Sequence, residues 1–140
     1  ELGLAPALVD LAERQQAAGL QVDVTVDGLG AVPPEVGSAV YAIAAEAVRN
    51  VQRHAGASRC TIAARAAGGT LTVEVRDDGV GIAADAPPGV GTRSMRERAE
   101  GLGGTVAIGP ATPRGTAVVV TVPLLDVPAD RSASPSRTVP

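Results

Sequence analysis

Residues 46–54 read Glu-Ala-Val-Arg-Asn-Val-Gln-Arg-His, and this stretch indicates a helix that carries a polar rim. At about 100° per residue, four polar side chains share one arc of roughly 100°: Glu46, Asn50, Arg53 and His54. An overlapping arc is apolar and contains Val40, Ile43, Ala47 and Val51. Polar groups beside a buried face are costly unless something uses them.

The chemistry of this rim suits a metal-bound phosphate. Asn and Glu oxygens suit a hard cation, and the forked guanidinium of Arg suits phosphate oxygens. The alternative is an ordinary surface helix with scattered polar residues. The stretch alone does not decide between the two.

The composition indicates one globular domain. The 140 residues are enough for a single sizeable core, and they are 45% hydrophobic and 19% charged. With one Tyr and no Phe or Trp, the core must consist of Val, Ile, Leu and Ala. The net charge of -3 argues against nucleic acid as a partner.

Several features predict a reducing, cytoplasmic setting. Cys60 is the single cysteine, which excludes an internal disulfide, and we interpret it as a small buried hydrophobe rather than a reactive thiol. No apolar run reaches the roughly 20 residues of a membrane helix, and no signal peptide is recognised. The start at Glu1, without Met, indicates a fragment of a longer protein, whose other parts could include a membrane anchor.

Hydrophobic periodicity predicts an α+β fold. Helices are expected over residues 4–18, about 34–54, and from after Gly91 to about 102, where Ser94 and Glu97 have capping-box spacing. Strands are expected over 20–26, 58–65, 70–76, 105–108 and 116–122. This order predicts a two-layer sandwich, a mixed sheet covered on one face by helices.

The remaining segments are predicted to be turns, a loop and a tail. Gly68-Gly69 predicts a hairpin, and residues 83–88 a mobile loop. The folded domain is expected over residues 1–123 and a disordered tail over 124–140.

Three glycine patterns each have a simple structural interpretation, and the first two also have a functional one. Asp77-x-Gly79-x-Gly81 is either a turn at a strand end or a floor on which a flat ligand approaches the backbone, with the carboxylate accepting from an exocyclic amine. Gly89-x-Gly91 is either a flexible link or the approach to a helix whose first amides hold phosphate. Gly115-Thr116 could be simple hairpin chemistry.

Together, these patterns resemble the GHKL ATPase superfamily over residues 2–123. Glu46-x3-Asn50-x2-Arg53-His54 is similar to its N box, and the glycine patterns to its two glycine boxes and final Gly-Thr. Residues 1–8 and the run Gly91-x3-Met95-x-Glu97-Arg98 resemble catalytic domains of sensor histidine kinases of the nitrate-sensor and DesK-like subgroup. Thr92 departs from that pattern, which usually has Leu after the second glycine.

The resemblance implies a Bergerat-type fold and a role for each matched residue. Asn50 would hold Mg2+, Glu46 would act as base or orient a metal-bound water, and Arg53 and His54 would contact phosphates. Asp77 would accept from adenine, with Thr116 supporting a water. Gly79 and Gly81 would form the floor on which the base binds. The lid over the phosphates would contain Gly89, Val90 and Gly91.

The implied activity is that of a histidine protein kinase. The domain would bind Mg-ATP and donate the γ-phosphate to a histidine on a helical dimerisation domain of the parent kinase, which signals to a response regulator. His54 is the single histidine, and its N-box position favours a phosphate contact or a structural role over phosphoacceptance. The alternatives are an anti-sigma-factor serine kinase, or a nucleotide-dependent interaction module without transfer chemistry.

Overall fold

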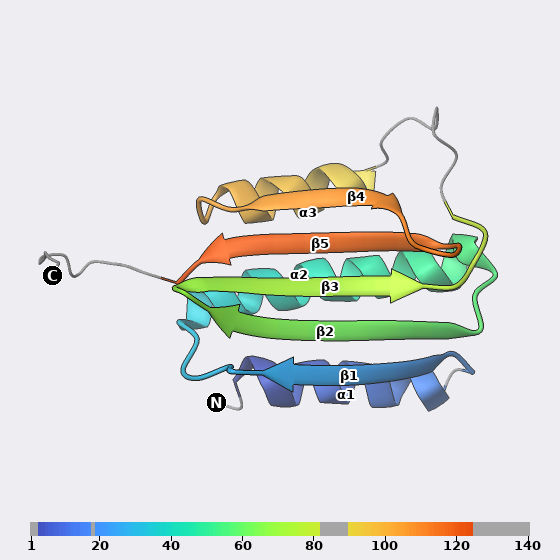
Figure 1. Cartoon of the computed structure of the whole chain (residues 1–140), viewed down its shortest axis with the longest axis horizontal. Coiled ribbons are helices and arrows are strands. Elements are labelled where there is room, and N and C mark those ends of the chain that lie inside the picture. Colours follow the sequence, from blue (N-terminus) through green and yellow to red (C-terminus); the bar gives the residue numbers. More distant parts are fainter. Residues whose placement is uncertain (1–2, 18, 82–89, 125–140) are drawn as a thin grey trace, which may run out of the picture.

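The computed structural model describes residues 3–17, 19–81 and 90–124, which form one sheet with helices on one side. The elements are α1 (Leu4–Ala17), β1 (Gln21–Asp27), α2 (Pro34–Asn50), η1 (Val51–Ala55), β2 (Arg59–Ala67), β3 (Thr70–Asp77), α3 (Val90–Glu100), β4 (Thr105–Pro110) and β5 (Thr116–Pro123). Figure 1 shows the helices behind the sheet, so the molecule has two layers. The predicted α+β sandwich with a mixed sheet is confirmed.

The sheet has the strand order β1-β2-β3-β5-β4. β1 pairs with β2 in parallel because α2 crosses over between them, and the other pairs are antiparallel. The β2–β3 hairpin turns at Gly68 and Gly69, whose φ angles of 60° and 77° are those that a tight hairpin turn requires.

The core lies between the sheet and the helices and is aliphatic, as the composition predicted. Alternate residues of β3 are buried, including Leu71, Val73 and Val75. α2 meets them with residues at helical spacing: Val36, Val40, Ile43, Ala44, Ala47 and Val48. The same alternation places Asp77 and Thr116, both buried, on the helix-covered face of the sheet.

The long helix has the predicted extent but a different last turn, and the predicted start of the third helix needs correction. The long helix ends in a π-helical turn, η1, which Gly56 closes in the left-handed conformation at φ 59°. α3 begins at Val90, so Ser94 lies inside the helix and the capping-box prediction is wrong. Met95 and Ala99 are buried, so the helical turns on both sides of Ser94 belong to α3 and pack on the core. Gly91, expected before the helix, lies in its first turn.

The predicted loop over 83–88 and the predicted tail beyond Leu124 lie outside the described residues. The division into a domain of residues 1–123 and a tail of 124–140 therefore stays a prediction. Across residues 3–17, 19–81 and 90–124, each helix is too short or too polar to cross a membrane.

Candidate functional site

The described segments that carry predicted site residues lie at one end of the molecule. Figure 1 shows that η1, the carboxyl end of β3, the start of α3 and the start of β5 all lie at that end. The fold therefore brings the N-box stretch and the first glycine box to the same edge of the sheet, although more than 20 residues separate them in the sequence.

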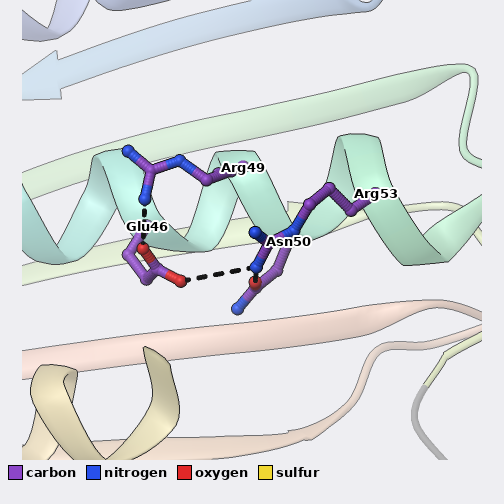
Figure 2. Close-up of polar contacts among 4 residues, drawn as sticks. All are labelled: Glu46, Arg49, Asn50 and Arg53. Carbon is purple, nitrogen blue, oxygen red and sulfur yellow. Dashed lines mark hydrogen bonds and ion pairs between the residues drawn. The ribbon is translucent and has the colours of Figure 1, made fainter. Parts of the chain in front are cut away.

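The helix rim, defined here as Glu46, Arg49, Asn50 and Arg53, is a connected polar network. Arg49 Nη1 donates to Glu46 Oε1 at 2.6 Å, and Arg53 Nη2 donates to Asn50 Oδ1 at 3.1 Å. Arg53 Nη2 also lies 3.9 Å from Glu46 Oε2. Figure 2 shows Glu46 and Asn50 projecting from the same side of α2, with the two guanidinium groups beside them.

Burial distinguishes the members of this rim. The Glu46 side chain is 18% exposed, whereas Arg49 and Arg53 are 57% and 54% exposed. A half-buried carboxylate with no cation beside it would be costly, so the arginines stabilise Glu46 where it stands. The rim thus presents one amide oxygen and one carboxylate, and two exposed arginines neutralise the carboxylate.

The strand end, defined here as Asp77, Gly79, Gly81 and Gly115, is fixed by the backbone. Asp77 is 5% exposed, and its Oδ1 accepts the Gly79 N–H at 2.8 Å. A Cβ on Gly115 would lie 1.9 Å from the Asp77 carbonyl oxygen, and one on Gly81 would lie 3.1 Å from the Gly115 oxygen. Only glycine permits this close approach of β3, its following turn and β5.

The neighbours of Asp77 in the sheet are Cys60 and Thr116. Cys60 is its register partner on β2, and one step beyond the Arg76–Ala117 pair the register places Thr116 opposite it on β5. Burial, reinforced by the nearby Asp77 and Asp78 carboxylates, raises the pKa of the Cys60 thiol to about 12. Cys60 is buried, as predicted, and it stays a neutral thiol.

Asp78 has a structural role at the strand end. Its carboxylate accepts from Ser58 N, Ser58 Oγ and Arg59 N, each at 3.0 Å, and so ties the turn after β3 to the start of β2. The Arg59 backbone N–H, followed by the Ser58 groups, holds the pKa of this carboxyl below its ordinary value. Asp77 is thereby kept in place by its own neighbour in the sequence.

Two arginines that no sequence motif indicated complete these arrangements. Arg49 gave no signal separable from surface charge, yet it holds Glu46. Arg114 Nε donates to the Gly79 carbonyl oxygen at 3.0 Å and fixes the turn from the β4–β5 connection. Its position directly before Gly115-Thr116 was the available clue.

The other predicted residues are placed only in part. His54 lies in η1 and Val90 and Gly91 in the first turn of α3, but their side-chain environments and Gly89 lie outside the described residues. The structure brings together Glu46, Asn50 and Arg53 at the rim, and Asp77, Gly79 and Gly81 at the strand end, beside Thr116. The individual roles stay predictions.

Comparison with known proteins identifies the family. Residues 35–126 match the family model described as histidine kinase-, DNA gyrase B- and HSP90-like ATPase. The chain therefore belongs to this ATPase family.

Its relatives place it more narrowly. The chain is 31% identical over 131 residues to the sensor histidine kinase NarS of Mycobacterium tuberculosis, covering 89% of this chain and 30% of NarS. It is 34% identical over 116 residues to the nitrate/nitrite sensor protein NarQ of Escherichia coli, covering 81% of this chain and 20% of NarQ. It thus spans under a third of the length of these relatives, and it is the ATP-binding catalytic domain of a sensor histidine kinase.

Solved structures agree with this assignment. The blue-light activated histidine kinase of Erythrobacter litoralis superposes with a TM-score of 0.74 at 26% identity, covering 87% of this chain and 45% of that one. The ATP binding domain of PrrB from Mycobacterium tuberculosis shares the fold, with a TM-score of 0.70 at 16% identity, covering 88% of this chain and 95% of that one. The predicted resemblance to sensor histidine kinases is confirmed.

Proposed function

We propose that the domain binds Mg-ATP between the helix rim and the strand end. It would then donate the γ-phosphate to a histidine on a helical dimerisation domain of the parent kinase, from which a response regulator receives it. The observation that carries this proposal is the buried Asp77 carboxylate. Asp77 is held by the Gly79 backbone at the carboxyl end of β3, and the carboxyl end of α2, which carries Glu46 and Asn50, lies at the same end of the molecule.

The strand end would select the base. One oxygen of Asp77 accepts from Gly79 N–H, which leaves the carboxylate further lone pairs for an amine donor such as that of adenine. The absence of side chains at Gly79 and Gly81 would let a flat ring approach the backbone. Thr116, opposite Asp77, would support a water that shares this contact.

The donor set at the rim fits a divalent cation that arrives with a nucleotide. Asn50 Oδ1 would hold Mg2+, with Glu46 beside it, although no cluster of three or more His, Cys, Asp or Glu exists in residues 3–17, 19–81 and 90–124. Mg2+ commonly keeps waters and phosphate oxygens among its ligands, so few protein donors are needed. When bound, the ion would neutralise developing charge on the phosphates.

The helix rim and His54 would divide the remaining work. Arg53 and His54 would contact phosphate oxygens, and Glu46 would act as base or orient water. In this family pattern His54 belongs to the nucleotide site, so the nucleophile comes from the dimerisation domain. We therefore expect the isolated domain to bind nucleotide but to hydrolyse it slowly.

The test is a titration with a non-hydrolysable ATP analogue, with and without Mg2+, on wild type, Asn50→Ala and Asp77→Asn. Asn50→Ala should remove the Mg2+-dependent part of the affinity. Asp77→Asn should weaken adenine binding about 10- to 100-fold, the range for a hydrogen bond to a charged group, because the Asn amide would present a donor to a donor. Equal affinity of Asp77→Asn for ATP and GTP analogues is expected. Wild-type selectivity retained in that variant would contradict the proposal.

Phosphotransfer distinguishes the alternatives. Radiolabel from ATP should pass to a supplied dimerisation domain of a related sensor kinase and remain absent when its histidine is replaced. Tight complex formation with a sigma factor instead would support the serine-kinase alternative. The similarity to NarS and NarQ favours the histidine kinase.

A further inference from the structure

We infer that Arg53 serves as a resident counter-ion of the rim, which closes the Asn50–Glu46 oxygens to free divalent cations until nucleotide phosphates withdraw its guanidinium. This inference rests on the proposed function and adds to it an order of events. Metal would enter with the nucleotide, not ahead of it.

The geometry of Arg53 carries the inference. Its Nη2 lies 3.1 Å from Asn50 Oδ1 and 3.9 Å from Glu46 Oε2, so one cationic nitrogen contacts the amide and faces the carboxylate (Figure 2). These are the two oxygen-bearing side chains that would face a metal ion. A guanidinium placed there competes with a dication for the same lone pairs and adds repulsion at short range.

Arg53 is also free to leave. Its side chain is 54% exposed, and exposed ion pairs are worth little, so phosphate oxygens offer the guanidinium a better bidentate partner. Its departure would uncover Asn50 Oδ1 as the phosphates arrive. Arg49 would stay behind on Glu46 Oε1 at 2.6 Å and keep that carboxylate oriented.

Arg49 provides a matched control for Arg53. The two arginines lie on adjacent helical elements, have nearly equal exposure at 57% and 54%, and both pair with Glu46. Only Arg53 contacts Asn50. Replacing either by Gln removes the same charge, so a difference between the variants reports on the Asn50 contact and not on general electrostatics.

The experiment measures Mn2+ binding without nucleotide, by electron paramagnetic resonance, on wild type, Arg53→Gln, Arg53→Lys and Arg49→Gln. Arg53→Gln should bind Mn2+ about 2- to 5-fold more tightly than wild type, the equivalent of an exposed charge contact. Arg49→Gln should change the affinity less than half as much, and Arg53→Lys should stay within twofold of wild type. Equal effects of Arg53→Gln and Arg49→Gln, or none from Arg53→Gln, would overturn the inference.

A second measurement separates this inference from the proposed function. The Mn2+ series is repeated with a saturating non-hydrolysable ATP analogue, where wild type should bind Mn2+ at least tenfold more tightly than without it, and where Arg53→Gln should show a smaller gain. Wild type that binds no analogue would refute the proposed function itself. Wild type that binds the analogue with an unchanged gain in Arg53→Gln would refute only the role of Arg53.

Discussion

The helix rim and the strand end hold negative charge in opposite ways. At the rim, Glu46 is neutralised by Arg49 and Arg53, whose side chains are more than half exposed. At the strand end, Asp77 is 5% exposed and is held by the Gly79 backbone N–H and by the close approach of Gly115. Exposed ion pairs exchange partners at little cost, whereas closely packed backbone cannot rearrange without a large cost. The rim is therefore suited to exchanging ions, and the strand end is suited to recognising a ligand of one shape.

This comparison predicts that the strand end supports the fold and that the rim does not. The largest expected effect is that of Gly115→Ala. The new Cβ would lie 1.9 Å from the Asp77 carbonyl oxygen, at a residue whose φ is +100°. Positive φ and overpacking together should lower the free energy of unfolding by about 3 kcal/mol or more. Urea denaturation followed by circular dichroism measures it.

The control for that substitution is Gly109→Ala on β4. A Cβ at Gly109 would meet nothing within 4 Å, and its φ is not positive. Its free energy of unfolding should change by less than about 1 kcal/mol. Similar losses in the two variants would show that the approach to Asp77 is not what restricts residue 115.

A smaller effect is expected at Cys60, the strand partner of Asp77. Cys60→Ala should cost about 1 kcal/mol at pH 7, because it removes one fully buried sulfur atom. The pKa of this thiol is raised from 9.0 to about 12 in the fold. Below pH 9 both states keep the proton. Between pH 9 and 12 only the unfolded chain loses it, so wild-type stability falls in that window.

The measurement is denaturation of wild type and Cys60→Ala from pH 7 to the highest pH at which both refold. The difference between them should shrink above pH 9, since the variant lacks the thiol. A difference that stays constant would contradict the raised pKa. The native thiol should also resist alkylation at pH 8 and react after unfolding.

A still smaller effect is expected from Asp78→Asn, because this carboxylate is exposed. Its folded pKa is lowered by the Arg59 and Ser58 hydrogen bonds, so it stabilises the fold above its unfolded pKa and loses that contribution as pH falls through the lowered folded value. Wild type should be more stable than Asp78→Asn at pH 7, and the two should converge in acid. Thermal melts at pH 7 and pH 3 measure this. Parallel pH profiles would speak against the Ser58–Arg59 contacts as the cause.

Residue periodicity predicted the fold because each element carries a clean pattern. The strand over 70–76 and the apolar arc of Val40, Ile43, Ala47 and Val51 were both confirmed. Ser94 and Glu97 misled because residues three apart also face each other inside a helix, and burial of Met95 extends α3 toward Val90. The spacing of Ser94 and Glu97 alone therefore does not show where α3 begins, because it contains no information on which residues pack on the core.

The site was predictable where a motif is local and not where a contact crosses the chain. Asp77, Gly79 and Gly81 lie within one turn, so the sequence shows their relation directly. The approach of Gly115 to Asp77 and the bond from Arg114 to Gly79 join residues 35 or more apart, and only the strand pairing brings them together. Arg49 was missed for another reason: an exposed arginine on a helix has the same sequence signature whether or not it holds a carboxylate.

The smallest expected effect sharpens the comparison at the rim. In a double-mutant cycle of Arg49→Gln and Glu46→Gln, the coupling free energy should be about 0.5 kcal/mol, because Arg49 is 57% exposed and water competes for its charge. Denaturation of wild type, the two single variants and the double variant gives this coupling free energy. Repeating it at low and at high salt shows how far salt screens the coupling. A coupling of several kcal/mol would mean that the rim is as rigid as the strand end. In that case Arg49 would hold Glu46 as firmly as the backbone holds Asp77, and the contrast between the two regions would be lost.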